Sequence, residues 1–396
     1  ASFLLPMSVA PSSPQPIAPA SYTLRIVQPA FTSQLTDVVI ELEHLRRLQL
    51  SGDTPGPIFF QLKTIFHLLE SLGSARIEGN HTTLADYIEA KLDGPASQTD
   101  AMREIDNIER AMNYLESVVK PGDAITHQLV RELHLLTVDG LVREGDRTPG
   151  AYRSGNVQIA GATHTPPDVV QVQSLMDELL AYVNAPDAPK YDLLKTALAH
   201  HRFAWVHPFG NGNGRVVRLF TYALLLKYGF NVSTGGRVLN PTAVFCNNRE
   251  RYYEMLATAD AGSDEGLEAW ALYVLAGVRD ELKKVDQLTR YDFLKDKILL
   301  PALAWSRGRG FIDTDEERLL RMAVQKGQFK ARDIDEELPA LSPRQRTYRL
   351  NKLITSGMVK PVAPNTRTYC VQFAHSGLMR GVIRLLTEQG FTPELG

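Results

Sequence analysis

The sequence predicts a mainly α-helical protein that ends in a small mixed module. Apolar residues between about 35 and 303 recur at a three-to-four spacing, as at Val38, Leu42 and Leu45, and this is the period of helices that bury one face. After a glycine- and arginine-rich stretch at 306–310, the pattern changes to three short helices and then to an alternating segment, which is typical of a hairpin. We therefore expect a helical core followed by a separate C-terminal module.

The composition is that of an ordinary globular protein, with 44% hydrophobic and 22% charged residues among 396. The formal net charge is −2, from 43 basic and 45 acidic residues, which excludes a generally basic nucleic-acid coat. The longest nearly apolar run, 219–226, is too short to span a bilayer. The first twenty residues hold five prolines and no charge, unlike a secretory signal. We expect a cytoplasmic protein with no membrane partner.

The helices are bounded by turn residues and caps. Thr126 is expected to cap the fifth helix, and Gly229 to end the eighth in a left-handed conformation. The eighth helix is apolar nearly all round, so it should lie at the centre of the bundle. The expected core helices span about 35–51, 58–78, 83–92, 100–119, 127–138, 166–180, 191–206, 216–228, 249–259, 266–284 and 287–303.

Two segments depart from the helical pattern. Between Gly150 and Gly161, alternating apolar residues bracketed by glycines predict a short β-hairpin. Beyond the core, helices at 316–325, 331–338 and 342–356 precede a hairpin over 359–373, the order of a winged helix-turn-helix. The predicted domains are a proline-rich arm (1–34), an N-terminal helical region (35–122), a core (123–290), a linker (291–310) and a winged-helix domain (311–396).

The most informative stretch is His207-Pro-Phe-Gly-Asn-Gly-Asn-Gly-Arg-Val-Val-Arg218. Its three glycines let the backbone approach a ligand closely, and the following helix favours an anion at its N-terminus. Arg215 and Arg218 lie three residues apart, so they face the same side. A phosphate cradle beside one histidine is the skeleton of a phosphoryl- or nucleotidyl-transfer site. The plainer alternative is a glycine-rich connection whose arginines pair with carboxylates.

These residues resemble the signature of the Fic family, His-x-Phe-x-acid-Gly-Asn-Gly-Arg-x-x-Arg, and the resemblance extends over about 35–290. It implies a helical Fic core that transfers AMP from ATP to a Ser, Thr or Tyr hydroxyl of a target protein. His207 would be the general base and Phe209 a core anchor. The nucleotide phosphates would be bound by Gly210, Asn211, Gly212, Asn213, Gly214, Arg215 and Arg218.

One position departs from that signature. The family's acidic residue, which helps to hold Mg²⁺, is Asn211 here. An amide oxygen can bind Mg²⁺, but the ion prefers carboxylate and phosphate oxygens. The outcome is weaker metal binding, a changed nucleotide or leaving group, or an inactive enzyme. Because the other signature residues are intact, we expect a working or conditionally working enzyme that uses ATP and Mg²⁺, with Asn211 as a weak ligand.

A second motif lies upstream of the signature. Ser74, Glu78 and Gly79 match the family's inhibitory pattern, Ser/Thr-x-x-x-Glu-Gly/Asn, although the same spacing is also common in capped surface helices. The resemblance implies that Glu78 pairs with Arg218, which then cannot hold the γ-phosphate. The sequence leaves open whether Glu78 acts within its own chain or on a neighbour.

Two further sets of residues are placed by the resemblance. The hairpin at 150–161 would be a flap that docks the target by main-chain pairing, or it is a plain surface hairpin. Residues that follow the signature, two of them aromatic, would close over the nucleotide base, or they belong to the hydrophobic core. The flap residues are Val157, Gln158 and Ile159, and the adenine-pocket residues are Asn248, Tyr252 and Tyr253.

The third helix of the C-terminal module carries Arg344, Arg346, Arg349 and Lys352, with no acid between 342 and 360. Such a face suits DNA phosphates, but a protein contact or a homodimer is equally compatible. The main hypothesis is a self-inhibited protein adenylyltransferase. The alternatives are a DNA-binding regulator with a weakened, nucleotide-sensing Fic core, and an enzyme that removes AMP from proteins with Glu78 positioning water.

Overall fold

The computed structural model describes residues 22–47, 52–93, 99–229, 243–373 and 375–392. Helices dominate these residues, and none of those described is both long and apolar enough to cross a membrane. The core helices are α1 (Gln34–Arg47), α2 (Gly56–Ile77), α3 (Leu84–Asp93), α4 (Asp100–Val118), α5 (His127–Val138), α6 (Val172–Asn184), α7 (Asp192–Val206), α8 (Asn213–Lys227), α9 (Ala243–Cys246), α10 (Arg249–Ala259) and α11 (Asp264–Thr289).

Caps and turns place the ends of these helices close to the expected positions. The hydroxyl of Thr126 accepts a hydrogen bond from the N–H of Leu129 at 3.2 Å and so caps α5. Gly229 follows α8 with a φ of +84°, the left-handed geometry that glycine adopts without strain. Both predictions are confirmed. The larger differences among the starts are at α6, which begins at Val172 rather than at 166, and at α8, which begins at Asn213 rather than at 216.

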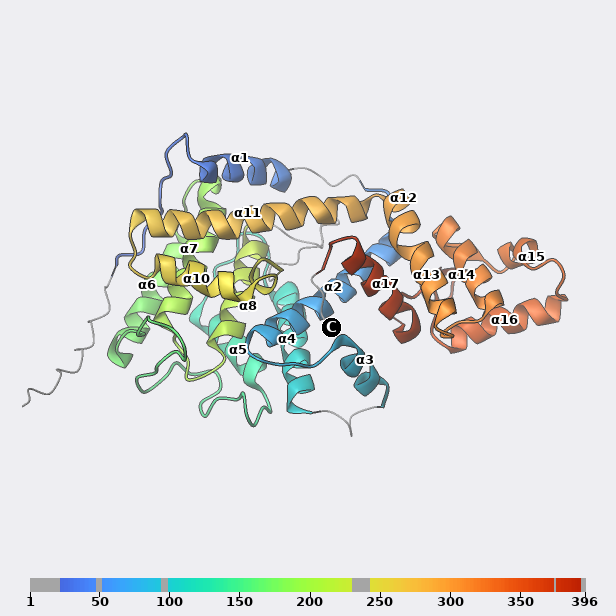
Figure 1. Cartoon of the computed structure of the whole chain (residues 1–396), viewed down its shortest axis with the longest axis horizontal. Coiled ribbons are helices and arrows are strands. Elements are labelled where there is room, and N and C mark those ends of the chain that lie inside the picture. Colours follow the sequence, from blue (N-terminus) through green and yellow to red (C-terminus); the bar gives the residue numbers. More distant parts are fainter. Residues whose placement is uncertain (1–21, 48–51, 94–98, 230–242, 374, 393–396) are drawn as a thin grey trace, which may run out of the picture.

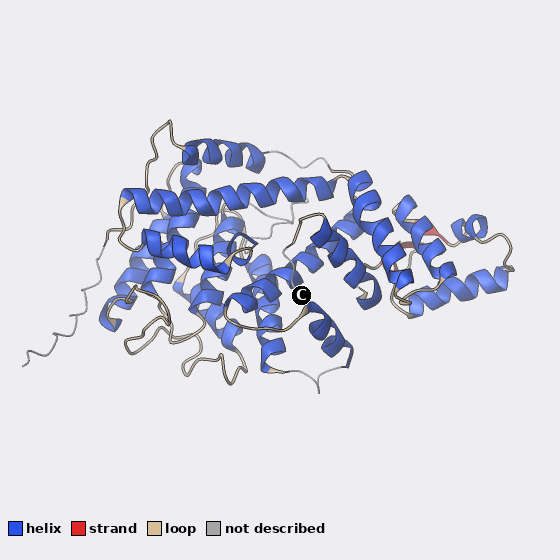
Figure 2. Cartoon of the chain, viewed as in Figure 1, coloured by secondary structure: helices blue, strands red, loops and turns tan. Residues whose placement is uncertain are grey.

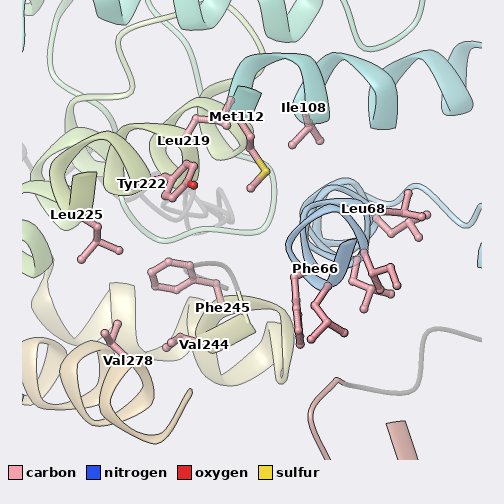
Figure 3. Packing of buried hydrophobic residues seen from close by; sticks show 14 of the residues in the cluster. Phe66, Leu68, Ile108, Met112, Leu219, Tyr222, Leu225, Val244, Phe245 and Val278 are labelled. Carbon is pink, nitrogen blue, oxygen red and sulfur yellow. The ribbon is translucent and has the colours of Figure 1, made fainter. Parts of the chain in front are cut away.

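Helix α8 lies at the centre of the core, as its sequence predicts. All of its residues except Gly214 and Lys227 are buried, and it packs against α2, α4, α5 and α7. Figure 3 shows apolar side chains of α2, α4, α8, α9 and α11 meeting in this interior. In Figure 1, α1 and α11 lie side by side along one edge of the core. The signature residues at the start of α8 are thus built into a packed interior.

The chain leaves the core through a nearly continuous run of helix. A short α12 (Tyr291–Phe293), a π-helical turn (Leu294–Leu299) and α13 (Leu300–Gly308) follow one another. The stretch at 306–310 is expected to be a linker, but helix α13 continues through most of it. Ser306 is fully buried there and donates to the carbonyl of Gly377 at 3.0 Å. The boundary between the linker (291–310) and the winged-helix domain (311–396) stays a prediction.

The C-terminal module combines helices with a small sheet, and it extends from one end of the core (Figure 2). Its helices are α14 (Thr314–Lys326), α15 (Asp333–Glu337), α16 (Pro343–Thr355) and α17 (Ser376–Glu388). Its strands are β1 (Phe329–Lys330), β2 (Val359–Pro361) and β3 (Thr368–Val371), paired antiparallel in the order β1-β3-β2. The expected hairpin is therefore β2–β3, with Asn365 at a φ of +62° in its turn.

The same module is bonded directly to helix α2. The side-chain amide of Gln61, which is buried, donates to the carbonyl of Val371 at 2.7 Å, and its oxygen accepts from the N–H of Phe373. Gln61 thus pairs with the backbone at the end of β3 much as a neighbouring strand would. Helix α2 is consequently tied to the module near its N-terminal end.

The hairpin expected at 150–161 is wrong. All of these residues are described, and none forms a strand. The segment is instead held by buried Arg153, whose guanidinium donates to the carbonyls of His207, Gly155 and Pro167 and whose N–H donates to Pro208. Pro166 and Pro167, which follow, have no N–H groups to offer a ladder. Alternation at Val157 and Ile159 therefore marks an extended loop.

Candidate active site

The turn between α7 and α8 is closed by its own side chains. His207 follows the last residue of α7 with a φ of +50°, a conformation uncommon for residues other than glycine. Asn213 then brackets Phe209, accepting from its N–H and donating to its carbonyl, both at 2.9 Å. Phe209 itself is fully buried and stacks on His134 with ring centroids 3.9 Å apart, which fits a core anchor.

The start of α8 offers unpaired backbone donors. Gly212 precedes the helix with a φ of +74°, and no described side chain caps the helix there. The first N–H groups of a helix, here those of Asn213 and Gly214, have no partner within it. Together with the helix dipole, they form a site that favours an anion.

A cavity of about 670 Å³ opens at this point. This volume lies in the range of small-molecule sites. Besides the turn, it is lined by His207, Arg218 and Glu78, by the loop residues Gln158 and Ile159, and by one face of α10. Helix α10 contributes residues 249, 252, 253, 254, 256 and 257, mostly at the helical period, and Asp260 follows directly after its end.

The imidazole of His207 is oriented as a base. Its Nδ1 lies 3.4 Å from the carbonyl of Ala204. Because a carbonyl can only accept, Nδ1 carries the proton, and the lone pair is on Nε2. Since His207 lines the cavity, this arrangement places a proton acceptor beside the anion site.

Arg218 is held by two residues of α2. Its Nε donates to the hydroxyl of Ser74 at 2.8 Å, and its Nη2 donates to the Ser74 carbonyl at 2.9 Å and to Glu78 Oε1 at 2.7 Å. Burial raises the pKa of Glu78, but the charge and the hydrogen bond of Arg218, together with the charges of Arg215 and Arg249, leave this pKa below its ordinary value. The carboxylate also lies against Gly214, where an added Cβ would collide with it. Glu78 therefore occupies the anion site.

Arg215 takes a different position from the one expected. It is 1% exposed and is not among the described residues that line the cavity. Its guanidinium pairs with Glu104 of α4 at 2.7 Å and donates to the carbonyl of Glu144 at 2.9 Å. Glu104 also accepts from Asn80, the last residue of the inhibitory motif at 74–80, at 2.8 Å. Arg215 thus packs near Gly212 and does not face the cavity.

Comparison with known proteins agrees with this geometry. Residues 124–225 match the model of the Fic/DOC family. Protein adenylyltransferase Fic of Aedes aegypti is 30% identical over 206 residues, or 50% of this chain, and that of Drosophila melanogaster is 27% identical over 267 residues, or 65% of this chain. The matches span only 37% and 49% of these relatives' own lengths.

Residues 124–225 of this chain form a Fic/DOC family domain. The helical Fic fold is also seen in a Fic family protein of Desulfovibrio desulfuricans G20, whose structure superimposes with a TM-score of 0.51 at 21% identity, over 87% of this chain and 98% of that one.

The residues expected at the base of the Fic nucleotide divide into two groups. Tyr252 and Tyr253 line the cavity, where Tyr252 is buried and bonded to His200, and Tyr253 is 43% exposed. Asn248 instead caps α10 by accepting from the N–H of Arg251. Arg249, which the sequence pattern does not single out, also lines the cavity, and its guanidinium lies over the ring of Tyr253. A single arginine in a charged helix gives no signal by itself.

The Fic signature also implies a Mg²⁺ ion at the nucleotide phosphates. Asn211, at the position usually acidic, supplies one neutral oxygen, which already accepts from the N–H of Gly212 at 2.7 Å. Within the described ranges, no three or more His, Cys, Asp or Glu residues cluster closely enough to hold a metal ion. The residues present therefore fit a Mg²⁺ ion held mainly by phosphate oxygens.

Burial lowers the pKa of His207 to about 4. We therefore expect its Cε1 resonance, in isotopically labelled protein, to stay unchanged from pH 8 to pH 5.5. Because the unfolded chain takes up this proton near pH 6.5, the group also makes folding less favourable as the pH falls from about 6.5 towards 4. A midpoint for His207 near 6.5 would contradict its burial.

Proposed function

We propose that this protein is an adenylyltransferase that transfers AMP from ATP to a hydroxyl of a target protein, and that Glu78 restrains it. One observation carries the proposal: the Glu78 carboxylate occupies the anion site of the cavity that is also lined by His207. A site that attracts a carboxylate so strongly is suited to a phosphate.

The chemistry follows from these positions. The target hydroxyl oxygen attacks the α-phosphorus of ATP while His207 Nε2 takes its proton. A new oxygen–phosphorus bond forms, the bond to the β-phosphate oxygen breaks, and pyrophosphate leaves. The N–H groups at the start of α8 and the guanidinium of Arg218 stabilise the phosphate charge. Mg²⁺, when bound, neutralises further phosphate charge. Gln158 and Ile159 line the cavity where a target segment would dock.

The reaction type is tested with ATP labelled at either end. The Glu78→Gly variant is incubated with α-labelled and, separately, with γ-labelled ATP and Mg²⁺, and the protein-bound label is measured. We expect label only from the α-phosphate. Label from the γ-phosphate would show phosphoryl transfer, and no label from either, with the fold intact, would overturn the proposal.

Removal of AMP from a modified protein is a second candidate function, because Glu78 faces the same cavity and could position a water molecule. Its readout is free AMP released when the wild-type protein is mixed with the labelled Glu78→Gly product. Release without Glu78, in the Glu78→Gln variant, would contradict that role.

The C-terminal module supports the winged-helix prediction through the order of α14, α15, α16 and the β2–β3 hairpin. Its basic helix is, however, largely neutralised. Arg346 pairs with Asp335 at 2.9 Å, Arg349 with Asp315 at 2.7 Å, and Lys352 with Glu316 at 2.7 Å.

Of the four basic residues expected to contact DNA phosphates, only Arg344 is outside these pairs. We therefore favour a protein contact for this module over the DNA-binding regulator. A gel shift with DNA that is tight and weakens steeply with salt would reverse that preference.

A further inference from the structure

The backbone of Asn211, in the middle of the signature turn, is bonded on both sides of its Cα by residues outside the signature. Its N–H donates to Asp146 Oδ2 at 2.8 Å, and its carbonyl lies 3.2 Å from His134 Nε2. The side chain of Asp146 is 4% exposed and that of His134 is fully buried. Two buried polar side chains thus hold the backbone of one residue of the anion-binding turn.

The tautomer of His134 is fixed by its other neighbour. The N–H of Gly150 donates to His134 Nδ1 at 2.9 Å, so Nδ1 carries the lone pair and Nε2 carries the proton. His134 therefore donates to the carbonyl of Asn211. Burial lowers the pKa of His134 to about 4, so the ring is neutral. It joins the start of the 150–161 loop to the anion-binding turn.

The amide at position 211 and the carboxylate at 146 fit one another. Asn211 Nδ2 donates to the carbonyl of Gly145 at 3.2 Å, while its Oδ1 accepts from Gly212. An aspartate at 211 could not donate to Gly145, and its charge would lie beside that of Asp146, where like charges repel. Gly210 completes the fit, because a Cβ there would lie 2.9 Å from Asp146 Oδ2.

These contacts decide which backbone donors face the nucleotide. The N–H of Asn211 is taken by Asp146, and that of Gly212 by Asn211 Oδ1. The donors outside these contacts include those at the start of α8. Of the glycines expected to bind phosphate, Gly210 lets Asp146 approach, and Gly212 supplies the left-handed turn.

We propose that Asp146 and His134 are positioning residues that orient the anion-binding turn, and that Asn211 and Asp146 act as one matched pair, with the negative charge on Asp146. This inference rests on the proposed function, because it assigns the oriented turn to the nucleotide phosphates.

A charge swap tests the pair. In the Glu78→Gly background, Asn211→Asp, Asp146→Asn and the double variant are compared for ATP affinity by calorimetry, and for KM and kcat. Each single change is expected to weaken ATP binding roughly tenfold, the scale of one charge-assisted hydrogen bond, and to raise KM more than it lowers kcat. The double variant should recover to within about threefold of the parent.

Asp123→Asn is the matched control, since Asp123 also accepts a backbone N–H, from Lys120 at 2.8 Å, but lies exposed in a loop away from the cavity. It should leave ATP binding unchanged. A double variant no better than the single variants, or single variants that bind ATP like the parent, would overturn the proposal.

A second readout needs no nucleotide. The amide proton of Asn211 should exchange slowly in the parent, faster in Asp146→Ala, and as in the parent in Asp123→Asn. If this pattern holds while the parent binds no ATP, the positioning role stands and the proposed function fails. If ATP binds but the Asn211 amide proton exchanges as slowly in Asp146→Ala as in the parent, the positioning role is wrong.

Discussion

Replacing Glu78 by glycine is expected to raise the rate of AMP transfer at least tenfold. The substitution removes the carboxylate from the anion site and leaves Arg218, which is 1% exposed, without its acidic partner. A buried unpaired charge costs roughly 3–5 kcal/mol, and a nucleotide phosphate can supply the missing counter-charge. A tenfold change corresponds to only about 1.4 kcal/mol. Initial rates of label incorporation and ATP affinity measure the effect.

Glu388→Gly is the matched control for this prediction. Glu388 also ends a helix and pairs with an arginine, Arg384, at 2.8 Å, but it lies on α17 and is not among the described residues that line the cavity. Its loss should not alter the rate. Glu78→Gln, which keeps the shape but loses the charge, should fall between wild type and Glu78→Gly. A Glu78→Gly protein that is folded but no faster than wild type would contradict the restraint.

Changing His207 to asparagine in the Glu78→Gly protein is expected to slow transfer by about a hundredfold to ten-thousandfold, the usual contribution of a general base. Asparagine tolerates the left-handed backbone better than alanine does, so the turn should keep its shape at a φ near +50°. ATP affinity should therefore stay close to that of the parent. Label incorporation and calorimetry together separate lost chemistry from lost binding.

His44→Asn, on the exposed side of α1, provides the comparison for the same substitution elsewhere. It should be silent in both measurements. If His207→Asn transfers AMP as fast as its parent, another group takes the proton, and the assignment of His207 as the base is wrong.

Much of this site is encoded locally, which is why the sequence predicts it. The helical period, Thr126 as a cap and Gly229 as a terminator depend on neighbours within a few residues, and these predictions are confirmed. The contact between Glu78 and Arg218 is long-range, but the inhibitory motif and the signature together predict it.

What the sequence does not predict depends on residues brought together from distant segments. Asp146 and His134 lie in a loop and on α5 with no distinctive spacing, so only the fold shows that they meet at Asn211. Charge counting along α16 likewise misses the carboxylates that α14 and α15 bring to it. The alternation of apolar and polar residues at 157–159 is typical of a strand, but a strand also needs a neighbouring strand to pair with.

Helix α2 has a consequence for communication across the molecule. Its 22 residues make a rod about 33 Å long, with Gln61 bonded to the C-terminal module near one end and Ser74, with Glu78 just beyond the helix, bonded to Arg218 at the other. Any binding event that favours one position of this rod biases both ends. By thermodynamic reciprocity, a partner that loosens Glu78 by docking on the module must itself dock more tightly once nucleotide has displaced Glu78.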